Sequence, residues 1–258
     1  MDSFIINGHK SLEGEIEVRG AKNVVFPLLA ASLLVESESS FHNIPLIEDV
    51  FSMLAIMEKA GVQIDWIGER SIKVRPENFD PQKIDEGLVK KLRGSVLFLG
   101  PSCLKTASFS FPYPGGCLIG ARPIDSHLDV LRQYGFTIGG DHDVLKIQAP
   151  ERLAPSKITM PELSVTATCN ALMMAAAVEG KTTIHIADSD YQVQELALFL
   201  QKMGAKIDGI GSHTLVIEGS SKLHGADHNI ISDPIEAGTF ILLAHATKSN
   251  LTIKNVEA

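Results

Sequence analysis

The sequence predicts an α/β (α+β) fold built from repeated units, each made of a strand, a helix, a second strand, a second helix and a hairpin. Two observations lead to this prediction. A helix end, a glycine and an alternating strand recur three times, and the helices alternate between wholly apolar and amphipathic types. The 258 residues, of which 45% are hydrophobic, suffice for a large core in one or two domains.

The repeat is clearest at Gly61, Gly135 and Gly204, which lie 74 and 69 residues apart. Each glycine follows an expected helix end, where it suits the C′ position, and precedes the alternating apolar residues typical of a strand. A second short strand follows each time after a turn that contains glycine, which predicts a hairpin. These second strands are expected at residues 71–74, 144–147 and 214–217.

The helices that open the units are apolar on nearly every face, which is typical of helices buried on all sides. They are expected at residues 24–35, 94–100, 165–178 and 235–246. The later helices are amphipathic. Residues 47–60 place Val50, Leu54 and Met57 on one stripe, and residues 193–203 show the same pattern, so these helices cover a surface.

The fourth unit contains a strand that begins near residue 224, an apolar helix and a strand at residues 251–254. Its amphipathic helix and hairpin are missing, and an apolar helix without a covering partner exposes a large patch. We therefore expect a chain truncated within a second domain. The alternative is a natural short form, whose last half-unit caps the fold or pairs with another chain.

Composition argues against several classes of protein. The net charge of −8 and the pI of about 5.6 give no electrostatic support for a nucleic-acid partner. Three cysteines without a CxxC pair indicate a reducing compartment, and Cys103 and Cys169 are expected in the core. With no signal peptide and no apolar run of membrane length, we expect a cytoplasmic protein without a membrane partner.

Motifs for metals and cofactors are also missing. His224 and His228 are four residues apart, but the segment contains Gly225 and precedes a strand, which argues against a helical metal pair. Neither a GxxxxGK[ST] loop nor a GxGxxG motif occurs. We therefore expect neither a metal nor a cofactor.

Polar residues of different kinds occupy matching positions before the apolar helices. Lys22, Arg93 and Ser164 follow one another at intervals of 71 residues, and Asp233 and Glu236 lie near the start of the fourth helix. If the units are related by symmetry, two cations, a hydroxyl and several helix N-termini would meet in one anion site. The alternative is that Lys22 and Arg93 are solvated helix ends.

A glycine-rich loop at residues 114–123 carries the lone thiol of Cys117. Its glycines let a ligand approach the main chain, and Pro123 suits the first position of a helix over residues 124–133. Arg122 would then lie at a helix N-terminus, which favours an anion. A thiol beside an anion site is typical of a reactive site, and the alternative is a surface loop with an incidental cysteine.

Five motifs occur in order along the chain: Gly-Ala-Lys-Asn at residues 20–23, Leu-Arg-Gly-Ser at 92–95, Pro-Gly-Gly-Cys-Leu-Ile-Gly-Ala-Arg-Pro-Ile-Asp at 114–125, Ser-Val-Thr-Ala-Thr at 164–168 and Ile-Glu-Ala-Gly-Thr-Phe at 235–240. Together they resemble the enolpyruvyl transferases, and closely those that act on UDP-N-acetylglucosamine. The resemblance implies longer proteins with two similar domains, each an inside-out α/β barrel of three repeats, with substrates between them. Residues 20–225 would form one complete domain, and residues 1–19 and 226–258 parts of the second.

The resemblance implies transfer of the enolpyruvyl group of phosphoenolpyruvate to the 3′-hydroxyl of UDP-N-acetylglucosamine, with release of phosphate. This is the first committed step of peptidoglycan synthesis, and it needs no metal. By motif, Lys22, Arg93 and Arg122 would hold phosphoenolpyruvate, and Cys117 would donate a proton or assist product release and be alkylated by fosfomycin. The residues implied to contact the sugar nucleotide are Asn23, Arg93, Pro123, Asp125, Ser164, Val165 and Glu236.

Other functions stay open. A shikimate enolpyruvyl transferase would share the fold, although that branch lacks the Cys117 motif. A non-catalytic ligand-binding or assembly module would use residues 226–258 to pair with another chain, whereas a complete chain is expected to be a monomer. The sequence departs from the family pattern at Thr166, where many members carry glycine, and at Glu162, where some carry lysine.

Overall fold

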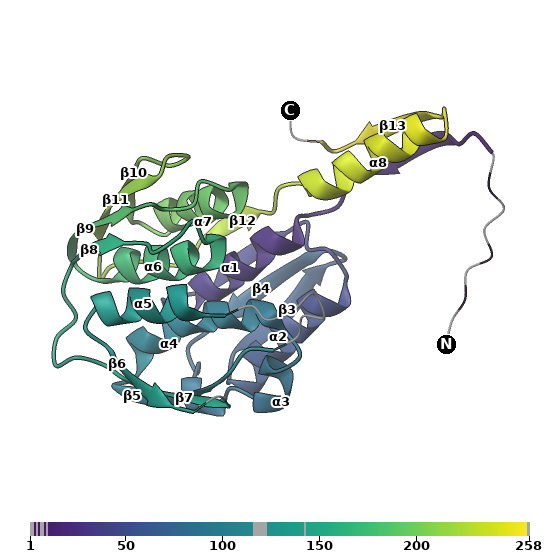
Figure 1. Ribbon diagram of the computed structural model, residues 1–258. Helices are drawn as coiled ribbons and strands as arrows, with labels where there is room; N and C mark the ends of the chain where they lie inside the picture. Colours follow the sequence, from purple (N-terminus) through teal and green to yellow (C-terminus); the bar gives the residue numbers. More distant parts are fainter. Residues whose placement is uncertain are drawn as a thin grey trace.

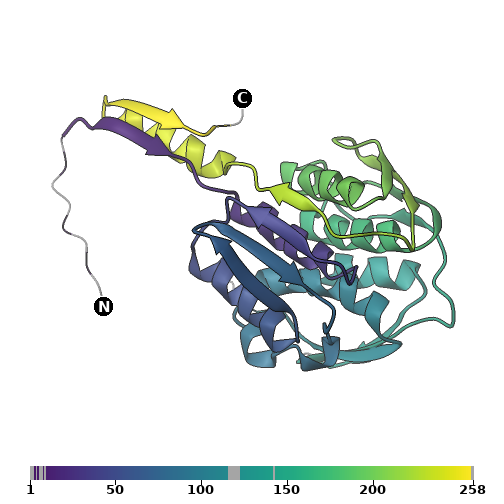
Figure 2. The same ribbon diagram turned by 180° about the vertical axis from the view of Figure 1, so that it is seen from behind.

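The computed structural model describes Ser3, Ile5, Gly8 and residues 10–115, 123–141 and 143–256. Cys117 and Arg122 lie outside the described residues. Figures 1 and 2 show two parts: a body of helices and sheets, and an arm that projects from it and contains both ends of the described chain.

The three repeat glycines end their helices in the same way. Gly61, Gly135 and Gly204 have φ angles of 96°, 91° and 109°, in the left-handed region that favours glycine. At the first of them, Gly61 donates its N–H to the carbonyl of Glu58 and Val62 donates to the carbonyl of Met57, both at 3.0 Å. The same pair of bonds recurs after the other two helices. These Schellman motifs turn each helix into a strand, and the predicted helix ends are confirmed.

The helical elements of the body follow the expected order. They are α1 (Lys22–Ser32), α2 (Glu48–Lys59), η1 (Pro81–Lys83), α3 (Glu86–Val89), η2 (Arg93–Phe98), α4 (Leu99–Lys105), α5 (Asp125–Gln133), α6 (Val165–Ala177) and α7 (Tyr191–Lys202). The strands are β2 (Ser39–His42), β3 (Gln63–Gly68), β4 (Ser71–Arg75), β5 (Ser108–Pro112), β6 (Thr137–Gly140), β7 (Val144–Gln148), β8 (Lys157–Thr159), β9 (Gly180–His185), β10 (Lys206–Asp208), β11 (Thr214–Gly219) and β12 (Asp227–Asn229).

The strands form three sheets around the helices. Their orders are β12-β2-β4-β3, β5-β7-β6 and β10-β11-β9-β8. Each expected hairpin is antiparallel, whereas β12 and β8 run parallel to β2 and β9. Alternate residues of a strand are buried, as Ile72 and Val74 of β4 are, so each sheet turns one face toward the helices and the other toward solvent. The predicted α/β fold, with helices inside and sheets outside, is confirmed.

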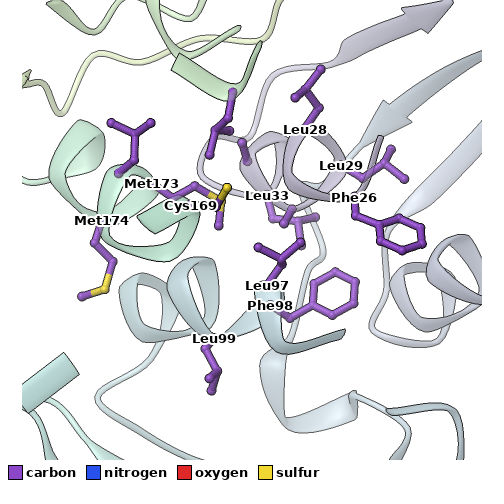
Figure 3. Close-up of a cluster of buried hydrophobic side chains, with 14 of the residues drawn as sticks. Phe26, Leu28, Leu29, Leu33, Leu97, Phe98, Leu99, Cys169, Met173 and Met174 are labelled. Carbon is purple, nitrogen blue, oxygen red and sulfur yellow. The ribbon is translucent and has the colours of Figure 1, made fainter. Parts of the chain in front are cut away.

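The core lies where α1, η2 with α4, and α6 pack together. Figure 3 shows Phe26, Leu33, Leu97, Cys169 and Met173 from these helices gathered in one cluster. Every residue of α6 from Ala167 to Ala176 is buried, which agrees with the expectation of a helix apolar on every face.

The apolar helix of the second unit differs from the expected single helix. It begins as the 3₁₀ helix η2 and continues as α4. Pro101 has no N–H for the carbonyl of Leu97, so the α-helical hydrogen bond is missing at this point. A Cβ on Gly94 would lie 2.6 Å from the ring of Phe26, so glycine permits the close approach of η2 to α1. Pro123 is not the first helical residue either, because α5 begins at Asp125 after the N-cap Ile124.

The arm consists of β1 (Glu13–Glu17), α8 (Pro234–Ala246) and β13 (Asn250–Lys254). β1 pairs in parallel with β13, and α8 lies against β13 (Figure 1). Of the α8 residues, all described, only Ala237 is buried, and Ile235, Ile241 and Leu242 are 60%, 56% and 70% exposed. The expected apolar helix is therefore present without a cover over most of its surface.

The chain crosses between body and arm twice, at adjacent points. Asp233 donates its N–H to the carbonyl of Arg19 at 2.8 Å. β12 belongs to the body, because it pairs with β2 and is followed by the fully buried Ile230. The expected boundary between residues 225 and 226 lies just before β12, which pairs within a sheet of the body.

Candidate functional site

A cavity of about 750 Å³ opens where the first turns of α1, η2 and α6 approach one another. Three of the residues predicted to form an anion site, Lys22, Arg93 and Ser164, line it together. The expected convergence of the three units at one point is therefore seen. The polar side chains in the lining are Lys22, Asn23, Asp49, Lys91, Arg93, Ser126, His127, Glu162, Ser164, Thr166, Asp188 and Gln192.

Three of the helices whose first turns line this cavity start without a carboxylate of their own. The N-caps of α1, η2 and α6 are Ala21, Leu92 and Ser164, none of which makes a side-chain capping bond, and their first turns hold no acidic residue. Every other described helix has a carboxylate at its N-cap or in its first turn, except α4, which continues directly from η2. Those carboxylates are the caps Asp80, Asp85, Asp190 and Asp233 of η1, α3, α7 and α8, and the first-turn acids Glu48, Asp49 and Asp125 of α2 and α5.

The difference has an electrostatic consequence. The N–H groups of a first helical turn and the helix dipole together attract an anion, and a capping carboxylate ordinarily meets that demand. In α1, η2 and α6 no carboxylate caps these N–H groups, so they can bind an anionic ligand in the cavity. The three helix starts therefore form one site suited to anions.

The cations of the cavity are held by neighbouring groups. The Lys22 Nζ lies 2.9 Å from the Asp49 Oδ2, and both side chains are partly exposed. The Arg93 Nη2 donates to the carbonyl of Pro123 at 2.8 Å, which places the guanidinium beside the end of the loop at residues 114–123. Each of these two cations is therefore held in the lining of the cavity by a neighbouring group.

A buried hydrogen-bonded group lies under the cavity. His127 bonds through Nε2 to the Thr166 Oγ1 at 3.1 Å and through Nδ1 to the Asn170 amide nitrogen at 2.8 Å. Burial, and to a smaller extent the charge of Arg93, lower the pKa of His127 from 6.5 to about 3. The imidazole is therefore neutral at physiological pH.

The other predicted residues fall into three groups. Asn23, Pro123 and Val165 also line the cavity. Asp125 begins α5 beside it but is not part of its lining. The Glu236 carboxylate accepts the N–H of Arg19 at 2.8 Å, at the crossing between body and arm and outside the lining.

Several lining residues were not among the predicted site residues. Asp49 and Gln192 lie in the first turns of amphipathic helices, where polar residues are ordinary and give no signal. His127 occupies the buried face of α5, and a histidine on such a face is usually a core residue. Cys169 also lines the cavity, and burial raises the pKa of its thiol. It is therefore a weak nucleophile, in keeping with the expected core position.

In the described part of the chain, no group of three or more His, Cys, Asp or Glu side chains is arranged to hold a metal ion. No helix among the described residues is both long enough and apolar enough to cross a membrane.

Sequence comparisons match this chain to enolpyruvyl transferases. A protein from Hydrogenovibrio crunogenus named UDP-N-acetylglucosamine 1-carboxyvinyltransferase is 38% identical over 256 residues, covering 99% of this chain and 61% of that protein. Proteins of the same name from Coxiella burnetii and Fervidobacterium nodosum are each 39% identical, with 59% and 60% of their lengths covered. The chain thus spans about three-fifths of the length of these relatives.

Solved structures share the fold. The enolpyruvyl transferase NikO from Streptomyces tendae superposes with a TM-score of 0.80 at 25% identity, over 92% of this chain and 56% of NikO. An EPSP synthase from Acinetobacter baumannii gives a TM-score of 0.69 at 17% identity, over 98% of this chain and 57% of that one, which shows the fold alone. The family model for EPSP synthase (3-phosphoshikimate 1-carboxyvinyltransferase) matches residues 6–258. Because the family model matches residues 6–258, nearly the whole length, this chain belongs to the EPSP synthase family of enolpyruvyl transferases.

Proposed function

We propose that this chain supplies one face of a site that transfers the enolpyruvyl group of phosphoenolpyruvate to the 3′-hydroxyl of UDP-N-acetylglucosamine in the cytoplasm, for peptidoglycan synthesis. The observation that carries the proposal is the cavity at the uncapped starts of α1, η2 and α6, with Lys22 and Arg93 beside it. Both substrates bear phosphoryl groups, which such a site favours. The relatives that bear this activity in their names match over 99% of the chain.

The reaction has two stages. The 3′-hydroxyl loses its proton to a base as its oxygen adds to C2 of phosphoenolpyruvate, and an acid adds a proton to C3, which gives a tetrahedral ketal. A proton then leaves C3 as phosphate leaves C2, and the enol double bond forms again. Lys22 and Arg93 would neutralise the phosphate as it gains charge, and the uncapped N–H groups would hold the same or a second phosphoryl group. Asn23, Ser164 and Val165 would contact the sugar nucleotide.

Cys117 and Arg122 would complete the site from the loop. Their roles are proposed from the motif, in which the thiol donates a proton or assists product release and the guanidinium holds phosphate. We expect fosfomycin to alkylate Cys117, and Cys117→Ala to abolish the added mass while Cys103 and Cys169 stay unmodified. Peptide mass mapping measures this, and an adduct that persists in the variant would contradict the assignment.

The choice of acceptor is tested by binding. We expect the 258-residue protein to bind UDP-N-acetylglucosamine in isothermal titration, and Arg93→Ala to weaken that binding at least about tenfold, the effect of losing a charge-assisted hydrogen bond. Lys83→Ala, a change of an exposed cation on η1, is the matched control and should leave the affinity unchanged. Binding of shikimate 3-phosphate in place of the sugar nucleotide would instead support a shikimate-type transferase.

Turnover is measured on the same preparation. Phosphate release from phosphoenolpyruvate is followed with and without UDP-N-acetylglucosamine. Release that needs the sugar nucleotide and is lost in Lys22→Ala is the result expected if the described cavity suffices. Phosphate release at the same rate with and without the sugar nucleotide would contradict the proposal.

A further inference from the structure

The amide of Asn170 has a fixed orientation, because two backbone groups determine it. The N–H of Gly100 can only donate, and it points at the Asn170 Oδ1 at 3.1 Å. The carbonyl of Val96 can only accept, and the Asn170 Nδ2 lies 3.0 Å from it. The oxygen and nitrogen of this amide are therefore distinguished by their partners.

The fixed amide in turn sets the tautomer of His127. The second hydrogen of the Asn170 Nδ2 points at the His127 Nδ1, 2.8 Å away, so that Nδ1 must accept and carries no proton. Because the ring is neutral, its single proton lies on Nε2. The Nε2–H therefore donates to the Thr166 Oγ1 at 3.1 Å.

The hydroxyl of Thr166 accepts this bond and keeps its own proton for another partner. Threonines in helices commonly return that proton to the carbonyl four residues earlier, as Thr239 in α8 and Thr247 at the C-cap of α8 do at 2.8 and 2.7 Å. Thr166 is in the first turn of α6, so the residue four positions earlier, Glu162, precedes the helix. The Thr166 side chain is partly exposed and lines the cavity.

We infer that Thr166 is a ligand-binding residue whose hydroxyl donates a hydrogen bond to a phosphoryl oxygen in the cavity, with His127 and Asn170 as the positioning residues that fix the direction of donation. This inference rests on the proposed function, because it takes the ligand to be a phosphoryl group at the start of α6. It adds a donor to the site that the predicted residues did not include. The backbone of η2 and α4 fixes the amide of Asn170, Asn170 donates to His127, and His127 donates to Thr166 at the cavity.

Binding by Thr166 variants tests the ligand contact. Thr166→Val keeps the branched shape and removes the donor, and we expect it to weaken UDP-N-acetylglucosamine or phosphoenolpyruvate about tenfold, whereas Thr166→Ser should stay within about threefold of the parent. The two ligands distinguish the sugar-nucleotide diphosphate from the smaller phosphate as the bound group. Uridine, which has no phosphoryl group, is the control and should respond to neither change.

The results separate this inference from the proposed function. Parent-like affinity of Thr166→Val for both ligands would overturn the inference alone. Failure of the parent protein to bind either ligand would overturn both.

The tautomer is measured without any ligand. Nitrogen-15 NMR of the histidine rings should show His127 protonated at Nε2, with no change from pH 8 to pH 5. A proton on Nδ1, or a titration midpoint near 6.5, would overturn the order of donors on which the inference depends.

Discussion

Helices α6 and α8 are alike in length and apolar character but differ in their surroundings. Each has 13 residues and is apolar on nearly every face. α6 buries ten of its residues among α1, α4, α5 and α7, whereas α8 buries only Ala237. An apolar helix thus acquires its burial from the elements packed on it, and periodicity alone does not reveal whether those elements are present.

The two helices also differ at their first turns. The Asp233 Oδ1 caps α8 by accepting the N–H groups of Ile235 and Glu236 at 2.8 and 3.3 Å. Ser164 makes no such bond at the start of α6, which opens into the cavity. The Asp233 side chain caps the N-terminus of the arm helix, whereas the first N–H groups of the body helix have no side-chain cap, and we propose that a ligand binds them.

The largest effect we expect concerns burial in the two helices. Leu172→Ala in α6 removes a fully buried side chain and should lower the free energy of unfolding by about 2–5 kcal/mol. Leu242→Ala in α8, where the side chain is 70% exposed, should change it by less than about 0.5 kcal/mol. Urea denaturation of both variants measures the contrast, and equal losses would show that α8 is packed as α6 is.

The next effect is a dependence of body stability on pH. The pKa of His127 is about 3 in the folded chain, against the ordinary histidine value of 6.5 in an unfolded one, so between these values the unfolded chain binds more protons. Stability should therefore fall as the pH falls, by roughly 2 kcal/mol from pH 8 to pH 5 for this residue. His127→Gln should remove that part of the slope in denaturation curves. An unchanged slope in the variant would mean that other groups produce it.

A smaller effect is expected at the cap of α8. Asp233→Ala should lower the local stability of the arm by about 1 kcal/mol, the usual cost of losing an N-cap. Hydrogen exchange should then become faster in α8 while the amides of α6 keep their rates. Faster exchange in both helices would show that the arm and the body unfold together.

The local signals in the sequence predicted most of the body. Gly61, Gly135 and Gly204 identified the helix ends, because a left-handed residue at a C′ position is a local requirement. The pairing of β12 with β2 was not predicted, since it joins residues about 187 positions apart and depends on which sheet has a free edge. This is why the expected boundary at residue 225 lies before a strand of the body.

For the site, the 71-residue interval led to Lys22, Arg93 and Ser164, which do line one cavity. The interval could not lead to Thr166 and His127. Their importance comes from a series of bonds that joins Thr166 to His127, His127 to Asn170, and Asn170 to the backbone of η2 and α4. Such bonds appear only when α5 and α6 are packed together.

We propose that the uncapped N–H groups at the start of α6 bind a phosphoryl group of the ligand. The measurement that tests it most directly is the affinity of Ser164→Asp for UDP-N-acetylglucosamine, with Ser164→Asn as a neutral cap of similar shape. Because a carboxylate would occupy the N–H groups and repel phosphate, we expect Ser164→Asp to keep or raise stability by up to about 1 kcal/mol and to weaken binding at least about tenfold. Ser164→Asn should weaken binding less. Parent-like affinity in a stably folded Ser164→Asp protein would contradict the claim.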